Sequence, residues 1–574
     1  MKILLIYPYC LEERLHEEDV GVLPIGLYYV GAALRENHYD CEILNWHDIN
    51  KTPGLIKETL VEKRPDVIGF SVLHANRWGA IDISRIAKQV DPSVTIVFGG
   101  IGTTFLWEHF LTHFREIDFC VLREGEYPFL NLIKSLERGD RTEIERIEGI
   151  AFRKDERIVK TKDAGAIKEL DELPDPSKYF RYQHVTSTRG CPGNCTFCGS
   201  PKLWERKVRF HSPVYFVHQL ERLYEKGIAF FYFSDDTFMV RKDRVIEICK
   251  RILERDLKIS WVAISHVDFV DEKLLYWMRK AGCVQISYGI ESGSEKIRRL
   301  LNKGIRTEQI KKAFSLTIRY GILPRAYFIY GSPGETWATI QETIDLIRKI
   351  KPLSIIFYIL DIFPGTALYS DFVKRSGVTD DIWLQQIEDI MYFETDPDLT
   401  EESILAFGEK LRAEFYAGLP VFVDSVDLID KKEFYELHAD FLSRLGMTFS
   451  HGDYAKIEAI RDKQKIAVRL YQRSLEYSPN DRAYLGLGII RQQERNFQES
   501  VRILSEGVGV FPQNEQLHIC LGLSYMNLGE YDKALSCFLK FRHSGTGGVL
   551  HCGVPPGIRE KRNRLGVSQI VEWK

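Results

Sequence analysis

Apolar segments alternate with amphipathic helical segments over the first 145 residues, and this alternation limits the possible folds more than any other feature of the chain. Short apolar runs at residues 3–7, 67–71 and 95–98 are separated by stretches with helical periodicity, as at 27–36 and 80–90. Such alternation predicts βαβ units and an open parallel sheet. Ligands of such sheets bind beyond the carboxyl ends of the strands.

The loops at those strand ends are rich in glycine and hydroxyl residues. Glycine lets the backbone approach a bulky ligand, and a hydroxyl can cap a helix or bind a phosphate. Many glycine-rich loops are simple turns, so this composition alone is weak support for a ligand site. The residues in question are Pro24, Gly26, Ser71, Gly99, Gly100 and Thr104.

A second alternating region begins near Val185, and about six strand-helix units follow it. The expected strands are residues 185–187, 229–233, 260–264, 284–288, 327–330 and 355–360. Six units predict a partial, open barrel, with the chemistry gathered at the carboxyl ends of its strands.

Three cysteines follow the first of these strands, in the sequence T-R-G-C-P-G-N-C-T-F-C-G-S. Cys191, Cys195 and Cys198 have the spacing C-x3-C-x2-C. Three thiolates can hold three irons of a 4Fe-4S cluster, which leaves the fourth iron open to a substrate. This spacing predicts catalytic and metal-binding cysteines.

A zinc knuckle or a disulfide explains these cysteines less well. Zinc needs a fourth ligand, and the next candidates along the chain are His211 and Cys249. A disulfide would leave one of the three cysteines unpaired, and the chain shows no secretory context.

From the cysteine run to about residue 370, the chain resembles the radical SAM (S-adenosylmethionine) enzymes. The strings S-D-D-T-F at 234–238, G-I-E-S-G-S at 289–294 and G-S-P-G-E-T at 331–336 carry this resemblance. In that family SAM chelates the open iron, and reduction produces an adenosyl radical. The resemblance implies that Phe197 lies against adenine, that Asp235 or Asp236 binds the methionine amine, and that Glu291 and Ser292 contact the ribose and carboxylate.

The first 145 residues resemble the cobalamin-binding domain that precedes many radical SAM modules. The strings V-L-P-I-G-L-Y-Y-V-G, P-D-V-I-G-F-S, F-G-G-I-G-T-T and L-R-E-G-E occur in the family order. The resemblance implies that the six loop residues named above contact cobalamin, with the nucleotide tail near Gly99, Gly100 and Thr104. The D-x-H-x-x-G motif is missing, so we expect no histidine ligand on the lower face of cobalt.

The expected fold class is α/β: a Rossmann-like cobalamin-binding domain, a partial (β/α)6 radical SAM barrel and an all-α C-terminal region. The expected boundaries are 1–145 for the first domain, 146–183 for a linker with a small β excursion, and 184–370 for the barrel. A helical extension covering the barrel follows at 371–460, tetratricopeptide-like repeats at 461–545 and a tail at 546–574. The repeats rest on a 34-residue period that relates Asn480 to Asn514 and Gly488 to Gly522.

The resemblance predicts a cobalamin-dependent methyltransferase that adds a methyl group to an unactivated carbon, with a 4Fe-4S cluster, SAM and cobalamin as cofactors. A radical cyclase or rearrangement enzyme, a methylthiotransferase and a redox-sensing scaffold with partner-binding repeats are the alternatives. We expect a small-molecule substrate (a lipid, a tetrapyrrole or a natural product) and an electron donor such as flavodoxin or ferredoxin. The repeats suit a protein partner.

Charge and hydropathy bear on partners and compartment. A formal net charge of −3 gives no electrostatic argument for nucleic acid. The first residues, M-K-I-L-L-I-Y-P, suit a buried strand better than a signal peptide, and residues 353–363 are too short to span a membrane. We therefore expect a cytoplasmic protein without a transmembrane segment.

Overall fold

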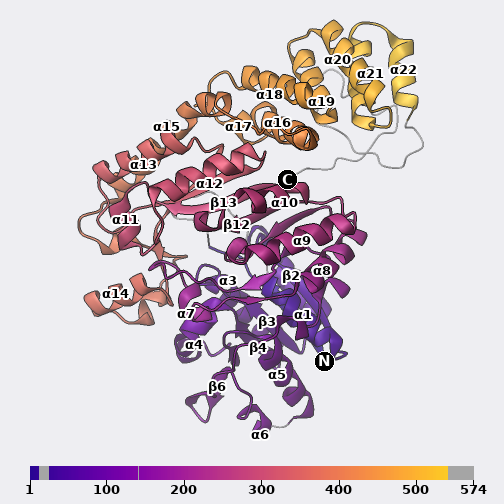
Figure 1. The fold of residues 1–574 in the computed structure, drawn as a ribbon. Coiled ribbons are helices and arrows are strands. Elements are labelled where there is room, and N and C mark those ends of the chain that lie inside the picture. The colour runs from indigo at the N-terminus through magenta and orange to yellow at the C-terminus, as the bar shows by residue number, and fades with distance from the viewer. Residues whose placement is uncertain (12–24, 53, 140, 541–574) are drawn as a thin grey trace. The chain divides into compact units, whose positions relative to one another are not determined.

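The computed structural model describes residues 1–11, 25–52, 54–139 and 141–540, which belong to two compact units (Figure 1). The first unit contains residues 1–318 and 322–418, and the second contains residues 319–321 and those from 419 onward. The predicted N-terminal domain lies in the first unit, as does the predicted barrel apart from residues 319–321. The expected tail lies outside the described residues.

The N-terminal domain is built on a seven-stranded sheet with the order β2-β1-β3-β4-β5-β6-β7. Its first five strands pair in parallel, which confirms the predicted open parallel sheet. These strands are β1 (Lys2–Tyr7), β2 (Asp40–Asn45), β3 (Val67–Ser71), β4 (Thr95–Gly99) and β5 (Phe119–Val121).

Helices cover this sheet, and the central strands are buried on both faces, as expected of a parallel sheet. Val67, Ile68 and Ile96 are fully buried, and Phe129 of a covering helix packs in the same core as Val67. The helices are α1 (Ile25–Glu36), α2 (Gly54–Lys63), α3 (Arg77–Val90), α4 (Ile101–His113), α5 (Glu126–Arg138) and α6 (Arg141–Ile144).

The β excursion expected within a linker at 146–183 is part of this sheet. Strands β6 (Ile150–Lys154) and β7 (Arg157–Lys160) form an antiparallel hairpin, and β6 pairs antiparallel with β5, with Phe119 opposite Phe152. The N-terminal sheet therefore extends to residue 160, and the connection that follows it contains only the short helices η2 (Leu170–Glu172) and η3 (Pro176–Lys178).

The barrel region is a six-stranded sheet with the order β15-β14-β13-β12-β11-β8. Every neighbouring pair is parallel, and β8 and β15 are its two edges, so the predicted partial barrel is confirmed. The strands are β8 (His184–Val185), β11 (Phe230–Phe233), β12 (Ser260–Ser265), β13 (Cys283–Glu291), β14 (Leu323–Tyr330) and β15 (Ser354–Ile359).

Helices connect these strands in the expected alternation. Ser212 and Thr336 begin two of the helices with side-chain caps, accepting from the backbone N–H groups of Tyr215 and Thr339. The helices are α8 (Pro213–Glu225), α9 (Lys242–Glu254), α10 (Glu272–Lys280), α11 (Glu295–Leu300), α12 (Thr307–Arg319) and α13 (Trp337–Ile350), with η4 (Phe238–Val240) and η5 (Val267–Phe269) before α9 and α10.

Two short elements interrupt the barrel between β8 and α8. Strand β9 (Thr188–Arg189) pairs antiparallel with β10 (Arg209–Phe210), and α7 (Ser200–Trp204) lies between them. The three cysteines occupy the loop from β9 to α7.

The region predicted as a helical extension, 371–460, is mixed. It includes most of α14 (Ala367–Ser376), η6 (Asp380–Leu384) and η7 (Tyr392–Thr395), but β16 (Asp361–Ile362) also pairs with β17 (Ile390–Met391). The long helix α15 (Glu401–Asp424) contains Pro420, beside the boundary between the two units. The sequence did not reveal this two-stranded sheet, since each of its strands has only two residues.

The second unit is helical. Asn480 and Asn514, related by the 34-residue period, each begin a helix by accepting from a backbone N–H three residues ahead, at 3.1 Å. A Cβ at Gly488 or Gly522 would lie within 2.6 Å of a side chain on the following helix. The two 34-residue segments thus have the same asparagine helix cap and the same close packing of a glycine against the following helix. The helices are η8 (Lys432–Phe434), α16 (Tyr435–Ser450), α17 (Asp453–Lys456), α18 (Lys463–Tyr477), α19 (Asp481–Gln493), α20 (Phe497–Val510), α21 (Glu515–Asn527) and α22 (Tyr531–Leu539).

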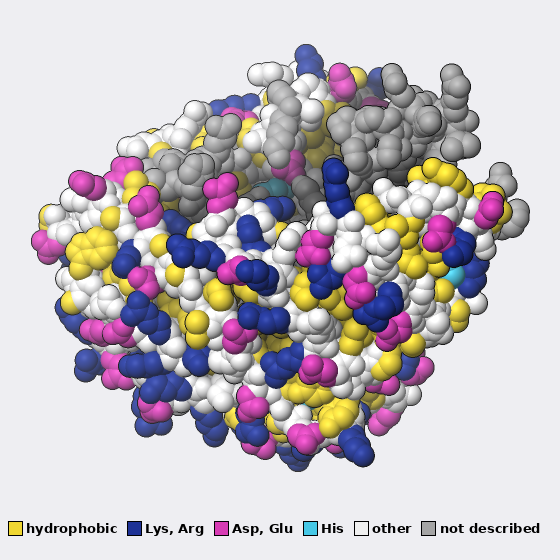
Figure 2. Space-filling model, turned by 90° about the horizontal axis from the view of Figure 1, so that it is seen from above, with side chains coloured by type: hydrophobic (Ala, Val, Ile, Leu, Met, Phe, Trp, Pro, Cys, Tyr) yellow, Lys and Arg dark blue, Asp and Glu magenta, His cyan; other side chains and the backbone are white. Residues whose placement is uncertain are grey.

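The surface carries charges of both signs. On the face seen in Figure 2, basic and acidic side chains are intermixed, with apolar groups between them. Among the residues described here, no helix combines the length and apolar character needed to cross a membrane.

Candidate functional site

The three cysteines lie together in one half-buried loop. Gly193 lies next to two of the sulfurs, and its backbone N–H donates to Cys191 Sγ at 3.4 Å. A Cβ at this position would lie 3.3 Å from Cys191 Sγ and 3.9 Å from Cys195 Sγ. Glycine therefore leaves the space in front of these sulfurs open. Phe197 is half-buried between the second and third cysteines.

Neighbouring elements hold the loop in place. The backbone N–H of Thr196 donates to the Leu301 carbonyl at 3.0 Å, and the Asn302 amide donates to the Asn194 carbonyl at 2.7 Å. The Leu368 N–H donates to the Thr196 carbonyl at 3.1 Å. The loop is thus fixed to the end of α11 and the start of α14.

The spacing of the sulfurs suits a cluster better than a single zinc ion. Among the described residues, one group of His, Cys, Asp or Glu side chains has three ligand atoms that all lie within 4.8 Å of one another, and it does not contain the cysteines. At least two of the three cysteine sulfurs are therefore more than 4.8 Å apart. Around one tetrahedral zinc, Zn–S bonds of about 2.3 Å would bring the sulfurs to about 3.8 Å. Burial raises the pKa of Cys198 to about 12, so its thiolate needs a nearby cation such as iron.

A buried ion pair lies beside the cysteines. Glu291, at the end of β13, has a left-handed backbone with φ of 65° and accepts from Lys303 Nζ at 2.7 Å. Burial raises the pKa of Cys195, and the positive charge of Lys303 opposes that rise. No sequence pattern pointed to Lys303, because only the fold brings it to Glu291.

The adjacent aspartates after β11 have different surroundings. The Asp235 carboxylate is buried and accepts from the backbone and hydroxyl of both Ser187 and Thr188, at 2.5 to 3.1 Å. Asp236 accepts from the Ser200 hydroxyl at 2.9 Å and lines a cavity. Burial raises the pKa of the Asp235 carboxyl. Asp235 therefore fixes the strand before the cysteine loop, whereas Asp236 faces space that a ligand can enter.

Ser292 is buried in protein contacts. Its hydroxyl lies 3.3 Å from Thr343 Oγ1 and accepts from the Ser294 N–H at 3.1 Å, and its carbonyl accepts from Arg298 at 2.6 Å. These bonds shape the turn after Glu291. The predicted contacts of Phe197, Glu291, Ser292 and the two aspartates with SAM stay predictions.

A cavity of about 280 Å³ lies between the N-terminal sheet and the start of the barrel. Its lining brings together four of the residues predicted to contact cobalamin, Gly26, Ser71, Gly99 and Gly100, with Gly190 and Asp236 of the barrel region. The strand ends of β3 and β4 open into it, as expected for a parallel sheet. A corrinoid exceeds this volume, so the cavity suits one part of such a cofactor. No histidine occurs among its described lining residues.

The glycine-rich segment at 99–104 differs from the expected loop, because α4 begins directly after Gly100. Gly100 has φ of 95°, and a Cβ there would lie 2.8 Å from the Val72 carbonyl oxygen. The Thr104 hydroxyl donates to the Gly100 carbonyl and accepts from the Arg123 N–H, both at 2.9 Å. Thr104 thus lies inside a helix with its hydroxyl bonded to protein. Pro24 lies outside the described residues.

A buried ion network beside the cavity was not predicted. Arg189, two residues before Cys191, pairs with Glu124 at 2.5 Å and with Glu126, and Arg209 pairs with Glu124 at 2.7 Å. The Arg189 guanidinium also lies 5.2 Å from the ring centroid of Tyr29. The network joins the segment after β5 to strands β9 and β10. The string L-R-E-G-E contained both glutamates, but nothing in the sequence identified their partners.

Comparisons with known proteins agree with this arrangement. Residues 185–347 match the radical SAM superfamily, and residues 21–133 match the B12 binding domain family. The chain is 30% identical over 460 residues to an uncharacterized methyltransferase, PH0819, of Pyrococcus horikoshii, with 77% of this chain and 97% of that protein aligned. It is also 30% identical to the anaerobic magnesium-protoporphyrin IX monomethyl ester cyclase of Rubrivivax gelatinosus, over 61% of this chain and 66% of that protein.

A solved structure shares the fold at low sequence identity. The methyltransferase TsrM of Kitasatospora setae, with cobalamin and a 4Fe-4S cluster bound, has a TM-score of 0.59 at 15% identity and covers 83% of this chain and 99% of its own. Taken with the cysteine loop and the glycine-lined cavity, these matches show that the chain belongs to the cobalamin-dependent radical SAM enzymes of the methyltransferase type, whose cofactors are a 4Fe-4S cluster, SAM and cobalamin.

Proposed function

We propose that this enzyme transfers a methyl group to an unactivated carbon of a small molecule. The observation that carries the proposal is the shared cavity, in which Gly99 and Gly100 of the cobalamin-binding sheet face Gly190 and Asp236 beside the cysteine loop. When bound, the cluster and SAM supply hydrogen abstraction, and cobalamin supplies the methyl group. Both must reach one substrate carbon, so the protein has to hold the two domains in a fixed arrangement.

The protein side of this chemistry is positioning. Cys191, Cys195 and Cys198 hold the cluster, and the Arg189–Glu124 pair fixes the segment before them against the cobalamin-binding sheet. We assign the SAM amine to Asp236 rather than Asp235, because four donors already occupy Asp235. Phe197, Glu291 and Ser292 remain the proposed contacts of adenine, ribose and the methionine carboxylate.

On the cobalamin side, Gly26, Ser71, Gly99 and Gly100 are the proposed contacts, since all four line the cavity. Thr104 supports them through its bond to the Gly100 carbonyl. We propose that no histidine ligates cobalt from below. The matching test is the electron paramagnetic resonance spectrum of the bound cofactor in the cob(II)alamin state, where a histidine ligand would add nitrogen splitting.

Product analysis tests the proposed reaction. The reconstituted protein would be incubated anaerobically with methyl-labelled SAM, a reductant, cobalamin and a small-molecule extract. Methyl transfer predicts S-adenosylhomocysteine and 5'-deoxyadenosine in equal amounts, with the label in one extract component. Absence of 5'-deoxyadenosine from the intact protein would contradict the radical SAM assignment. The Cys191→Ala variant is the negative control.

A radical cyclase is the second candidate function, and the match to the Rubrivivax cyclase favours it. Cyclisation would form 5'-deoxyadenosine without S-adenosylhomocysteine, and the label would be found in the released methionine and in unreacted SAM, not in the product. The same incubation therefore separates the two functions.

Partners and compartment belong to the same proposal. We expect flavodoxin or ferredoxin to deliver the electrons and the C-terminal repeats to bind a protein, all in the cytoplasm. Reduction of the cluster by purified flavodoxin and its reductase, followed by its absorbance near 400 nm, tests the first expectation.

A further inference from the structure

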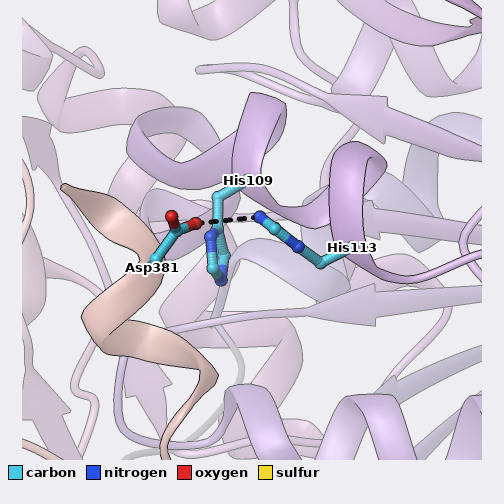
Figure 3. Close-up of side chains that lie close together, drawn as sticks. All are labelled: His109, His113 and Asp381. Atoms are coloured by element: carbon cyan, nitrogen blue, oxygen red, sulfur yellow. Dashed lines mark ion pairs between the residues drawn. The ribbon is translucent and has the colours of Figure 1, made fainter.

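Two histidines and an aspartate meet outside the cofactor cavity. His109 and His113 lie one helical turn apart on α4, so both side chains project from the same face. Asp381, in η6, approaches them from a segment that follows the barrel (Figure 3). One ligand atom from each residue lies within 4.8 Å of the other two, and His113 Nε2 is 3.0 Å from Asp381 Oδ1.

The pairing of His113 with Asp381 leaves His109 unexplained. His109 is only 6% exposed, and its Nε2 is buried without a hydrogen-bond partner among the described residues. A buried imidazole nitrogen without a hydrogen-bond partner can bind a metal ion.

The charged residues around this group include one that favours a bound cation and one that opposes it. Asp380 adds a second carboxylate next to Asp381 and is held by the Tyr369 hydroxyl at 2.7 Å. Arg77 opposes a cation, but its guanidinium donates to the carbonyls of His74, Ile387 and Glu388. The nearby carboxylates of Asp389 and Glu388 offset its positive charge.

We propose that His109, His113 and Asp381 bind a divalent transition-metal ion, with zinc as the ion best matched to them. Two imidazoles and one carboxylate form a donor set that zinc accepts, with water as the fourth ligand. Asp381 is 62% exposed and His113 31% exposed, so an ion can enter from solvent. The ion would cross-link η6 to α4, the helix that directly follows Gly100 of the cavity lining.

Zinc binding to the full-length protein tests this site. The cluster would be reconstituted first, so that its cysteines are occupied, and zinc affinity would then be measured by competition with a fluorescent indicator. We expect one tight zinc ion per chain and at least about tenfold weaker binding in His113→Gln and Asp381→Asn, because each loses a ligand. Iron and cobalamin contents should stay unchanged. His218→Gln, which alters a histidine on α8 bonded to Arg255, is the matched control.

Two results would overturn the site. One is wild-type zinc affinity and stoichiometry in both His113→Gln and Asp381→Asn. The other is sulfur in the first coordination shell of the zinc-loaded protein by X-ray absorption, since the site predicts only nitrogen and oxygen ligands at about 2.0 to 2.2 Å. Both measurements are independent of methyl transfer, so they stand whether or not the proposed function holds.

Discussion

Arg189 Nη1 lies 2.5 Å from Glu124 Oε1, which joins the strand before the cysteine loop to the segment after β5 of the cobalamin-binding sheet. Both side chains are largely buried, with 12% and 7% of their surface exposed. A charge removed from such a network leaves its partner buried and uncompensated. The pair therefore makes the position of the cysteine loop depend on the cobalamin-binding domain.

Replacement of Arg189 by methionine should lower the free energy of unfolding by about 3 to 5 kcal/mol, because Glu126 loses its guanidinium partner in a buried site. Urea denaturation followed by far-ultraviolet circular dichroism would measure the loss. Arg115→Met removes an exposed pair with Glu156, with side chains 71% and 80% exposed, and should leave the denaturation midpoint unchanged. Equal midpoints for the two variants would show that the Arg189 network adds no stability.

Cys191→Ala, Cys195→Ala and Cys198→Ala should each lower bound iron from about four per chain to well below that value, since a ligand of the cluster is lost. Iron analysis and absorbance near 400 nm after anaerobic reconstitution would show it. Cys537→Ser changes a cysteine of α22 and should retain full iron. A variant of any of the three loop cysteines with wild-type iron content would remove that residue from the ligand set.

Gly100→Ala should weaken cobalamin binding by about tenfold or more, because the new methyl group would lie 2.8 Å from the Val72 carbonyl oxygen and shift the cavity wall. Equilibrium dialysis with hydroxocobalamin measures it. Gly139→Ala is the matched control: its φ is also positive, at 68°, but nothing lies within 4 Å of the added Cβ. If both variants bound cobalamin like the wild type, the close approach at Gly100 would have no role in the site.

Glu335 should make stability fall as pH rises toward neutrality. Its carboxylate accepts from the backbone N–H groups of Gly331 and Ser332, yet burial raises its pKa from 4.5 to about 7. The folded state thus holds the proton more tightly than the unfolded state. This contribution is complete below about pH 4.5 and is lost as pH rises to 7, by about 3 kcal/mol.

The comparison that isolates Glu335 is with Glu335→Gln, which cannot titrate. The stability of the wild type relative to this variant should decrease between pH 5 and pH 8, as followed by thermal unfolding at fixed ionic strength. A difference that stays constant, or one that grows with pH, would contradict the raised pKa of this carboxyl.

Local pattern predicted most of the elements. Strand β3 has the predicted bounds, because its continuous apolar run reflects burial on both faces of the sheet. The start of α4 was hidden, because Gly99–Gly100 and two threonines have the composition of a turn. The hairpin β6–β7 was recognised as β structure, but its pairing with β5 was not predicted. That pairing joins residues about 30 positions apart in the chain.

The candidate site divides in the same way. The sequence by itself indicated the chemistry: three cysteines within eight residues predict a cluster with one open iron, and the resemblance of the first 145 residues to a cobalamin-binding domain implies cobalamin. Only the tertiary structure decided which groups meet, as in Arg189 with Glu124, Lys303 with Glu291, and Asp381 with His109 and His113. Short-range spacing is set along the chain, whereas such pairs form only when packing brings distant segments together and buries their charges.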